Sequence, residues 1–260
     1  MAQAKLSSCV VLLRETKTSF EVLMLKRRQG MSFGKAFVFP GGVLESLDTS
    51  FEWLEILGCA PEFLPANHYS CSVELTSLKI TAIRETWEET GIWLGNGQFR
   101  FKDNFLESCK KGTVPSVEKL NYFARIITPL SLPKRFDTTF FTSVVDRSNQ
   151  VFLNSQESEV FMWSHPSEIL NLFSNKQVVL MPPQVYILYL LNKHQSLTSL
   201  MEANPHRTPL LFQLQQEIAI LPGDHRHQFT LPEIKSLKLE HFLSFKPSKI
   251  GVYCSPALNL

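Results

Sequence analysis

The sequence predicts an α/β fold, and three observations lead to this prediction. Short apolar segments of strand length alternate along the chain with longer segments of helical periodicity. At 260 residues, with 44% hydrophobic residues and 20 Phe, the chain can bury a sizeable core. No apolar run approaches the length of a membrane-spanning helix. We therefore expect a packed domain in which strands and helices alternate.

The first part of the chain predicts three strands. Residues 8–13 and 20–25 are apolar segments joined by a polar turn, which is typical of two paired strands. Residues 36–39 form a third, short strand, which ends in a turn at Gly41-Gly42.

The segment 49–77 is expected to be an insertion that begins with a helix. Thr49 to Glu52 has the form of a capping box, and an apolar run starting at Trp53 follows it. Asp48, just before this box, has two interpretations. It is either a carboxylate that supports a site from behind or the N-cap of the inserted helix.

The remainder of the chain predicts further strands and helices. Strands are expected at 121–127, 135–145 and 159–163, and helices after His165-Pro166, near 184–194 and near 196–203. We place the main domain at 1–181 and treat 182–260 as a helical C-terminal extension packed on the same domain.

A helix at 74–90 carries three acidic side chains on one face of its last turn. Glu85, Glu88 and Glu89 are spaced i, i+3 and i+4, so their side chains project together. Gly91 follows as a left-handed C-terminal cap. The negative end of the helix dipole disfavours each exposed anion by roughly 0.3–1 kcal/mol, a cost that a bound cation would offset. Clustered carboxylates suit Mg²⁺ or Mn²⁺, whereas a solvated acidic helix end is the alternative.

These residues resemble the Nudix box. The box pattern is Gly, five residues, Glu, seven residues, and then Arg-Glu-aliphatic-x-Glu-Glu-x-Gly-aliphatic. Gly42 matches the opening glycine, and Asp48 stands where the first glutamate is expected. Arg84 to Ile92 match the second half, except that Thr86 replaces an aliphatic residue. The 35 residues at positions 49–83 stand where the pattern has seven.

One branch of the Nudix hydrolases, the acyl-coenzyme A diphosphatases, carries an insertion at this point. Further segments of the chain are similar to that branch: Leu25 to Gly42, Arg135-Phe136-Asp137-Thr138 and Leu221-Pro222-Gly223-Asp224. The resemblance makes the predicted α/β fold more specific. It implies a mixed β-sheet sandwiched between α-helices, with an insertion in the box and a helical extension at the C-terminus.

The resemblance also implies a divalent-metal site in which Arg84, Glu85, Glu88 and Glu89 are the catalytic residues. The three glutamates would bind Mg²⁺ or Mn²⁺, and Arg84 would orient them through charge-assisted hydrogen bonds. For Arg84, an ordinary ion pair with Glu88 on the helix surface is the alternative.

Substrate-binding residues are expected in two places. Gly41 and Gly42 let the backbone approach a ligand and expose amides to phosphate, although a plain turn is compatible with the same residues. Lys26, Arg27 and Arg28 are the candidates for docking an extra phosphate, such as the 3′-phosphate of coenzyme A. Three adjacent bases at the end of a strand could equally form a solvated edge.

Other polar residues have weaker assignments. Glu45 is interpreted either as a supporting carboxylate or as an exposed turn residue. Glu157 and Glu159 either contribute as a general base or are solvated acids. Asp137 either points at the site or fixes a strand end through Arg135. The cluster at 224–227 is interpreted as a turn.

The predicted function is hydrolysis of coenzyme A and acyl-coenzyme A esters to 3′,5′-ADP and 4′-phosphopantetheine or its acyl form. The alternatives are hydrolysis of ADP-ribose, NADH or nucleotide sugars, or a Nudix-fold binding protein without turnover. A net charge of +2 indicates neither a nucleic-acid partner nor a membrane-surface partner. Five cysteines without regular spacing favour an intracellular location. Leu260 is a weak peroxisomal hint in the poorly matching tripeptide Leu258-Asn259-Leu260, and the mitochondrion is the other organelle considered.

Overall fold

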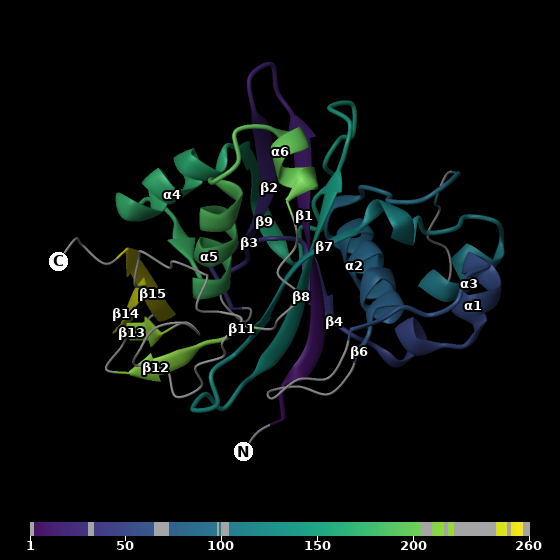
Figure 1. Cartoon of the computed structure of the whole chain (residues 1–260), viewed down its shortest axis with the longest axis horizontal. Coiled ribbons are helices and arrows are strands. Elements are labelled where there is room, and N and C mark those ends of the chain that lie inside the picture. The colour runs from purple at the N-terminus through teal and green to yellow at the C-terminus, as the bar shows by residue number, and fades with distance from the viewer. Residues whose placement is uncertain are drawn as a thin grey trace.

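A computed structural model places a mixed β-sheet between two layers of helices (Figure 1). The structure describes residues 3–30, 34–64, 73–97, 99, 104–203, 210–215, 218–220, 243–248 and 251–256. This arrangement confirms the predicted sandwich of a mixed sheet and helices. No helix in the described ranges is long and apolar enough to cross a membrane.

The central sheet has nine strands in the order β10-β3-β2-β1-β8-β7-β11, with β4 paired to β1 and β9 paired to β2. Its strands are β1 (Lys5–Glu15), β2 (Phe20–Arg27), β3 (Ala36–Val38), β4 (Gly41–Val43), β7 (Asn121–Ile127), β8 (Phe136–Val144), β9 (Ser158–Ser164), β10 (Val179–Leu180) and β11 (Leu210–Leu211). The strands expected near 8–13, 20–25, 36–39, 121–127, 135–145 and 159–163 are all present.

The helices divide between the two faces of the sheet (Figure 1). On one side lie α1 (Glu52–Leu57), α2 (Leu75–Thr90) and α3 (Phe105–Lys110), and on the other α4 (Pro166–Ser174), α5 (Pro182–Leu191) and α6 (Leu197–Glu202). Two 3₁₀ turns, η1 (Ser46–Thr49) and η2 (Val117–Lys119), complete the helical elements.

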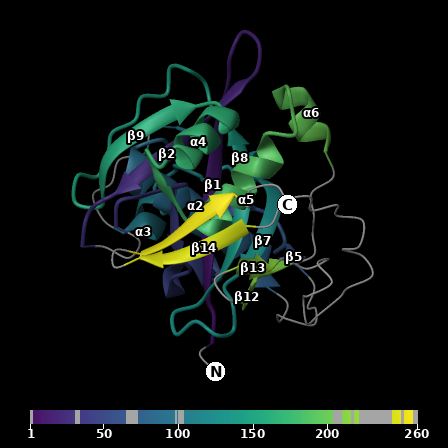
Figure 2. The same ribbon diagram turned by 90° about the vertical axis from the view of Figure 1, so that its left-hand side faces the viewer.

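Two smaller sheets accompany the central one. The first pairs β5 (Phe63–Leu64) with β6 (Val73–Glu74), and the second joins β12 (Gln213–Gln215), β13 (Ile218–Ile220), β14 (Leu243–Ser248) and β15 (Gly251–Pro256). Figures 1 and 2 place this second sheet on the same side of the molecule as α4 and α5. The cluster at 224–227 and the C-terminal tripeptide lie outside the described residues.

Strand β1 organises the sheet because it is long enough to pair with three strands. It runs parallel to β8 from Lys5 to Leu13, and its last residues pair antiparallel with β2. Beside its first half, Ser8 pairs with Gly42 and Cys9 with Gly41. Gly41-Gly42, expected as a turn, is therefore the start of an additional strand that pairs with the middle of β1.

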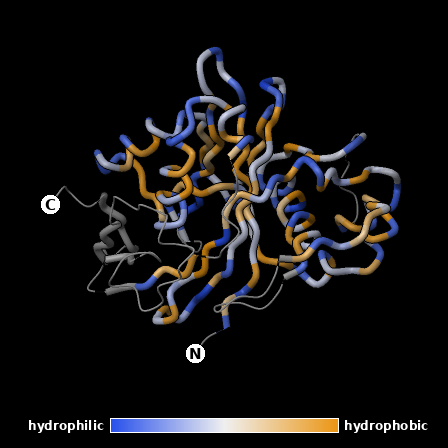
Figure 3. Tube along the Cα trace, viewed as in Figure 1, coloured by the Kyte–Doolittle hydropathy of each residue, from blue (hydrophilic) through white to orange (hydrophobic). Residues whose placement is uncertain are grey.

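Each face of the sheet packs against its own apolar core. Hydrophobic residues are found in the central strands and in the helices on both sides of the sheet (Figure 3). Val10 and Leu12 of β1 contribute to the core beneath α1, α2 and α3, while Val11 and Leu13 contribute to the core beneath α4, α5 and α6. This alternation follows from the period of two in a strand that is buried on both sides. α5 shares the second core with β1, and the boundary after residue 181 stays a prediction. The segment 182–260, expected to be helical, also contains the strands β11 to β15.

The inserted helix α1 is anchored by Trp53, which is 2% exposed and packs near Phe105 of α3. Its indole Nε1 donates to the Leu47 carbonyl at 2.8 Å. The predicted capping box at 49–52 is wrong, because the N-cap is Phe51 and makes no side-chain capping bond. The backbone N–H of Glu45 instead donates to Asp48 Oδ2 at 3.0 Å, one turn earlier at η1.

Candidate functional site

Arg84 and Asp48 form a buried ion pair that joins the two halves of the interrupted box. Arg84 Nε donates to Asp48 Oδ1 at 3.0 Å, and Nη2 donates to Oδ2 at 2.9 Å. Both side chains are nearly inaccessible to solvent, and Thr81 Oγ1 also donates to Asp48. Of the two interpretations of Asp48, the structure agrees with the supporting carboxylate. Within the insertion, β5 pairs with β6 and the Glu62 N–H donates to Thr76 Oγ1 at 2.9 Å, so this part of the insertion lies against the start of α2.

The remaining nitrogen of Arg84 reaches the acidic side chains. Nη1 donates to Glu85 Oε1 at 2.9 Å and to Glu88 Oε2 at 3.4 Å. Nη2 also donates to the Val43 carbonyl at 3.3 Å, which ties α2 to β4. Arg84 therefore contacts both Glu85 and Glu88, and its role in orienting them stays a prediction.

The two consecutive glycines of β4 pack directly against the acidic face of α2. The Gly41 N–H donates to Glu89 Oε2 at 3.1 Å. A Cβ atom built on Gly42 would lie 2.1 Å from Glu85 Oε1, and one on Gly41 would lie 2.3 Å from the Ser8 carbonyl oxygen. No other residue type fits at these positions without a shift of neighbouring atoms, so the glycines let the strand approach the carboxylates.

Gly42→Ala is therefore expected to be strongly destabilising. The methyl group would overlap the Glu85 carboxylate, and overpacking of this kind costs about 1–3 kcal/mol, or a fall in Tm of roughly 2–12 °C. Thermal denaturation of the variant measures this loss. Gly58→Ala is the control. It adds a methyl group at a left-handed φ where nothing lies within 4 Å of the Cβ position, so any fall in its Tm reflects backbone strain and not overlap. An equal Tm for Gly42→Ala and the wild type would contradict the close packing.

Thr86 replaces the aliphatic residue of the family pattern without leaving an unpaired hydroxyl. Its side chain is fully buried, and Oγ1 donates to the Ala82 carbonyl at 2.7 Å. The helix backbone thus satisfies the polar atom, which makes threonine compatible with a buried position. Gly91 caps the same helix in the left-handed conformation, as predicted, with φ of 68°.

Burial gives the glutamates unusual protonation properties. Burial raises the pKa of Glu89 to about 8, and the charge of Glu85 adds to the rise, while Arg27 and the Gly41 N–H oppose it. Burial and the charge of Glu88 raise the pKa of Glu85 to about 7, against the opposing charge of Arg84. The pKa of Glu88 is also raised, mainly by burial. Burial thus disfavours the charged forms of these carboxyl groups in the absence of a cation.

These pKa values predict how metal-free stability depends on pH. A carboxyl group with a raised pKa binds its proton more tightly in the folded state, so stability is lost as pH rises from about 4.5 towards 8. We expect the metal-free Tm to be roughly 5 °C or more lower at pH 8.5 than at pH 5.5. Millimolar Mg²⁺ or Mn²⁺ should remove this difference.

The control for this experiment separates the buried acids from general charge effects. Glu89→Gln should flatten the pH dependence, whereas the same change at the exposed Glu118 should leave it unchanged. A wild-type Tm that does not change between these pH values, with or without divalent cations, would contradict the raised pKa values of the buried acids.

The three basic residues at the end of β2 have different surroundings. Lys26 lies 3.8 Å from Glu159, and Arg28 Nη1 donates to the Ser155 carbonyl at 3.0 Å. A register shift in the pairing of β2 with β9 falls between Lys26 and Arg27. Arg27 is close enough to Glu89 for its charge to lower the pKa of that carboxyl group, and its Nε is buried without a partner in the described chain. A β-bulge commonly redirects a side chain in this way.

Of the two candidate general bases, only Glu157 influences the acidic face of α2. Its negative charge helps to raise the pKa values of Glu85, Glu88 and Glu89. Glu159 instead faces Lys26 and accepts a long bond from the Gln29 backbone N–H at 3.5 Å.

Asp137 does not belong to this site. It pairs through both carboxylate oxygens with Arg125 of β7, at 2.7 Å each, and not with Arg135. The Arg-Phe-Asp-Thr segment therefore fixes strand pairing.

The donor set fits a divalent cation, although the side chains are bonded to one another. Among the described residues, no three His, Cys, Asp or Glu side chains are already arranged as metal ligands. Glu85 accepts from Arg84, and Glu89 accepts from Gly41. The fit rests on two buried carboxylates with raised pKa values, because hard oxygen donors of this kind suit Mg²⁺ or Mn²⁺.

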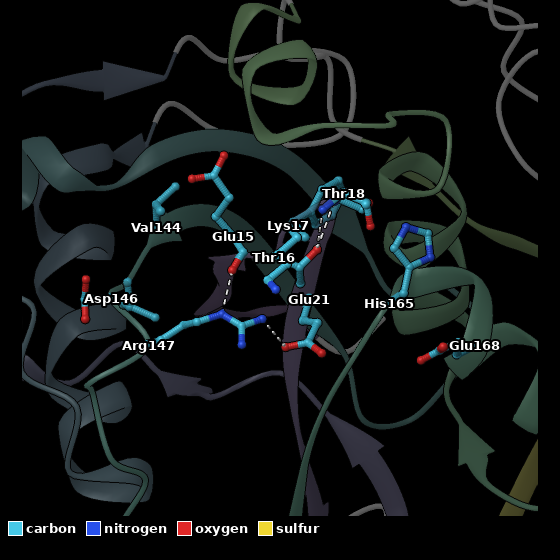
Figure 4. A pocket seen from close by; sticks show the side chains of 13 residues that line it. Glu15, Thr16, Lys17, Thr18, Glu21, Val144, Asp146, Arg147, His165 and Glu168 are labelled. Atoms are coloured by element: carbon cyan, nitrogen blue, oxygen red, sulfur yellow. Dashed lines mark hydrogen bonds and ion pairs between the residues drawn. The ribbon is translucent and has the colours of Figure 1, made fainter.

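A separate cleft of about 1090 Å³ lies at the other end of β1, where Glu15, Lys17, Arg147 and His165 line it (Figure 4). Arg147 Nε donates to the Glu15 carbonyl, and His165 Nδ1 lies 2.7 Å from Ser167 Oγ. The cleft contains none of the predicted site residues. We place the candidate site at the carboxylates because Glu85, Glu88 and Glu89 lie together there, in contact with Arg84 and Gly41.

Several known proteins resemble this chain in sequence or in fold. A family model described as the NUDT19 Nudix domain matches residues 99–191. The chain is 28% identical over 239 residues to the acyl-coenzyme A diphosphatase NUDT19 of Gallus gallus, covering 70% of this chain and 63% of the relative. It is also 28% identical to the Homo sapiens protein of the same name, over 236 residues, with coverage of 70% and 63%. The chain therefore spans less than two thirds of the length of these relatives.

A solved structure shows the same fold. The crystal structure of a NUDIX hydrolase from Alicyclobacillus acidocaldarius superposes with a TM-score of 0.62 at 21% identity, covering 79% of this chain and 98% of that one. The chain thus has the Nudix fold and resembles the Nudix hydrolases, as the box residues predict.

Proposed function

We propose that this Nudix-fold chain, which resembles the acyl-coenzyme A diphosphatases, hydrolyses the diphosphate bond of coenzyme A and its acyl esters. The products would be 3′,5′-ADP and 4′-phosphopantetheine or its acyl form. The observation that carries the proposal is the pair of buried carboxyl groups, Glu85 and Glu89, packed against Gly41-Gly42, whose charged forms burial disfavours. A divalent cation between these carboxylates and a negatively charged diphosphate ester would stabilise both.

Glu85, Glu88 and Glu89 would hold Mg²⁺ or Mn²⁺. The bound metal would neutralise the phosphate oxygens and stabilise the charge that develops in the transition state. Arg84 would keep Glu85 and Glu88 in place, since it is itself fixed by Asp48.

The chemistry requires a water molecule whose oxygen bonds to one phosphorus while the bridging oxygen leaves with the other. The proton of that water must pass to a base. We favour Glu157, because its charge acts on the three glutamates and it lies next to Ser158, the partner of Arg27 in the sheet.

The basic residues of β2 would divide two tasks between them. Arg27, whose buried Nε has no partner in the described chain, would contact the diphosphate beside Glu89. The exposed Arg28 and Lys26, whose side chain is 35% exposed, are left to meet the 3′-phosphate of coenzyme A.

One assay tests the proposed activity. The purified protein is incubated with Mg²⁺ or Mn²⁺ and with coenzyme A, acetyl-coenzyme A, ADP-ribose and NADH in parallel, and the products are separated by chromatography. We expect the highest kcat/KM for coenzyme A or its acetyl ester. A preference for ADP-ribose or NADH would replace the substrate assignment, and binding without turnover of any substrate would indicate a silent Nudix-fold protein.

We further propose a small-molecule partner only, with no nucleic acid or membrane partner, and a peroxisomal location ahead of a mitochondrial one. Imaging of a protein with an N-terminal fluorescent tag, which leaves the C-terminus free, tests this location.

A further inference from the structure

A row of buried polar side chains crosses three neighbouring strands of the central sheet. Thr139 of β8 is in register with Ser8 of β1 on one side and with Arg125 of β7 on the other. All three residues are at most 1% exposed. Each keeps one polar atom without a hydrogen-bond partner in the described chain, namely Ser8 Oγ, Thr139 Oγ1 and Arg125 Nη1.

The three side chains lie on the same face of the sheet, the one that α2 covers. Val10 and Phe141, each two residues beyond a member of the row, contribute to the apolar core on the α2 side. Side chains two residues apart in a strand share a face, and so do directly paired residues. Because neighbouring strands are about 4.8 Å apart, the three residues form one short row across β1, β8 and β7.

The charge of Arg125 is already neutralised. Its Nε and Nη2 each donate to one oxygen of Asp137 at 2.7 Å, which leaves Nη1 on the other edge of the guanidinium group. Nη1 carries N–H donors, and each hydroxyl group can donate and accept. Buried polar groups in folded proteins nearly always have partners, so three adjacent exceptions indicate a shared ligand.

We propose that Ser8, Thr139 and Arg125 form an internal binding site for water. Water accepts a hydrogen bond from Nη1 and can both donate to and accept from the two hydroxyl groups, whereas an anion can only accept. An anion would also add an uncompensated charge, because Asp137 already balances Arg125.

The proposed water site lies in the central sheet next to the candidate active site. Ser8 pairs with Gly42 on the side opposite Thr139, and Gly42 packs against the Glu85 carboxylate. The bound water would therefore link β1, β8 and β7 through hydrogen bonds. These bonds would lie next to β4, the strand against which Glu85 packs. This role is independent of the substrate proposed above.

Thr139→Val tests the proposal because it removes the hydroxyl group and nearly preserves shape. If water is bound, the variant leaves the water and Arg125 short of a partner, and we expect Tm to fall by roughly 2–8 °C. If the Thr139 hydroxyl is unpaired in solution, its removal relieves a cost and Tm stays the same or rises. An unchanged or higher Tm would overturn the proposal.

Ser143→Ala is the matched control. Ser143 lies on the same face of β8 and also has a buried hydroxyl without a partner in the described chain, but its register partner on β1 is the apolar Leu12. We expect its Tm to stay the same or rise. An equal fall in both variants would reflect general sensitivity of β8 and would also overturn the proposal.

Two further measurements identify the ligand. Oxygen-17 magnetic relaxation dispersion should detect a long-lived internal water that is lost in Thr139→Val; an identical profile in the variant would contradict the site. Tm is then compared in chloride and in gluconate buffers of equal ionic strength. Equal values support water, whereas a chloride-dependent Tm that Thr139→Val abolishes would assign the site to an anion.

Discussion

Glu85→Gln and Glu89→Gln are each expected to lower turnover at least about 100-fold while the protein stays folded. An amide lacks the negative charge needed to hold a divalent cation, so each variant loses stabilisation of the charge that develops on the phosphates. A glutamine at either position can keep the present hydrogen bond through its side-chain oxygen. Glu89 accepts a hydrogen bond from the Gly41 N–H, and Glu85 accepts one from Arg84. Steady-state kinetics with saturating Mg²⁺ measures the loss.

Stability separates this loss from unfolding. Removing a buried charge should keep the metal-free Tm of Glu89→Gln at or above the wild-type value at pH 8.5, because the pKa of Glu89 is raised to about 8. The stabilisation by Mg²⁺ should shrink in the same variant. Near-wild-type turnover in either variant would rule out the metal-site interpretation, and a lower metal-free Tm would point to a structural role.

The carboxylate helix could be predicted from sequence because its signals are local. The i, i+3, i+4 spacing places the glutamates on one face, and Gly91 ends the helix in the left-handed conformation that favours glycine. Local spacing does not reveal how deeply each side chain is buried. Glu89 is 2% exposed, while the side chain of Glu88 is 33% exposed, and this difference arises from the approach of β4.

The role of Asp48 shows where local reading fails. An acid in front of a Thr-x-x-Glu-like segment has the pattern of a helix cap. Asp48 instead accepts hydrogen bonds from Nε and Nη2 of Arg84, which lies 36 residues later in the chain. The capping-box pattern at 49–52 was misleading because the register of α1 is decided by the burial of Trp53. Long-range packing outweighed a cap that contributes only about 1 kcal/mol.

The different surroundings of Lys26, Arg27 and Arg28 could not be predicted from the sequence either, because they too depend on contacts between distant parts of the chain. On a regular strand Arg27 would face opposite to Lys26 and Arg28, but alternation does not tell which of the two faces meets the acidic side chains of α2. The register shift between Lys26 and Arg27 depends on how β9 pairs with β2, and β9 lies far along the chain. The register shift and the unpartnered Nε become visible only when the strands are assembled.

Arg27→Gln is expected to lower kcat/KM by about 10- to 100-fold on coenzyme A and on dephospho-coenzyme A alike. Both substrates contain the diphosphate, and a lost charge-assisted contact is worth about 1.5–3 kcal/mol. Lys26→Gln and Arg28→Gln should act differently. Each should reduce the preference for coenzyme A over dephospho-coenzyme A, because only coenzyme A carries the 3′-phosphate, and should leave activity on dephospho-coenzyme A nearly unchanged.

The dependence of activity on Mg²⁺ distinguishes a direct phosphate contact from an effect through Glu89. Arg27 lowers the pKa of Glu89, so its loss would raise that pKa and weaken metal binding. If this indirect effect dominates, saturating Mg²⁺ or a higher pH should restore most of the activity of Arg27→Gln; if Arg27 contacts the diphosphate, the loss should persist under both conditions. Should Arg27→Gln instead abolish only the discrimination by the 3′-phosphate, the three bases would act together at that phosphate, and the proposed contact of Arg27 with the diphosphate would be wrong.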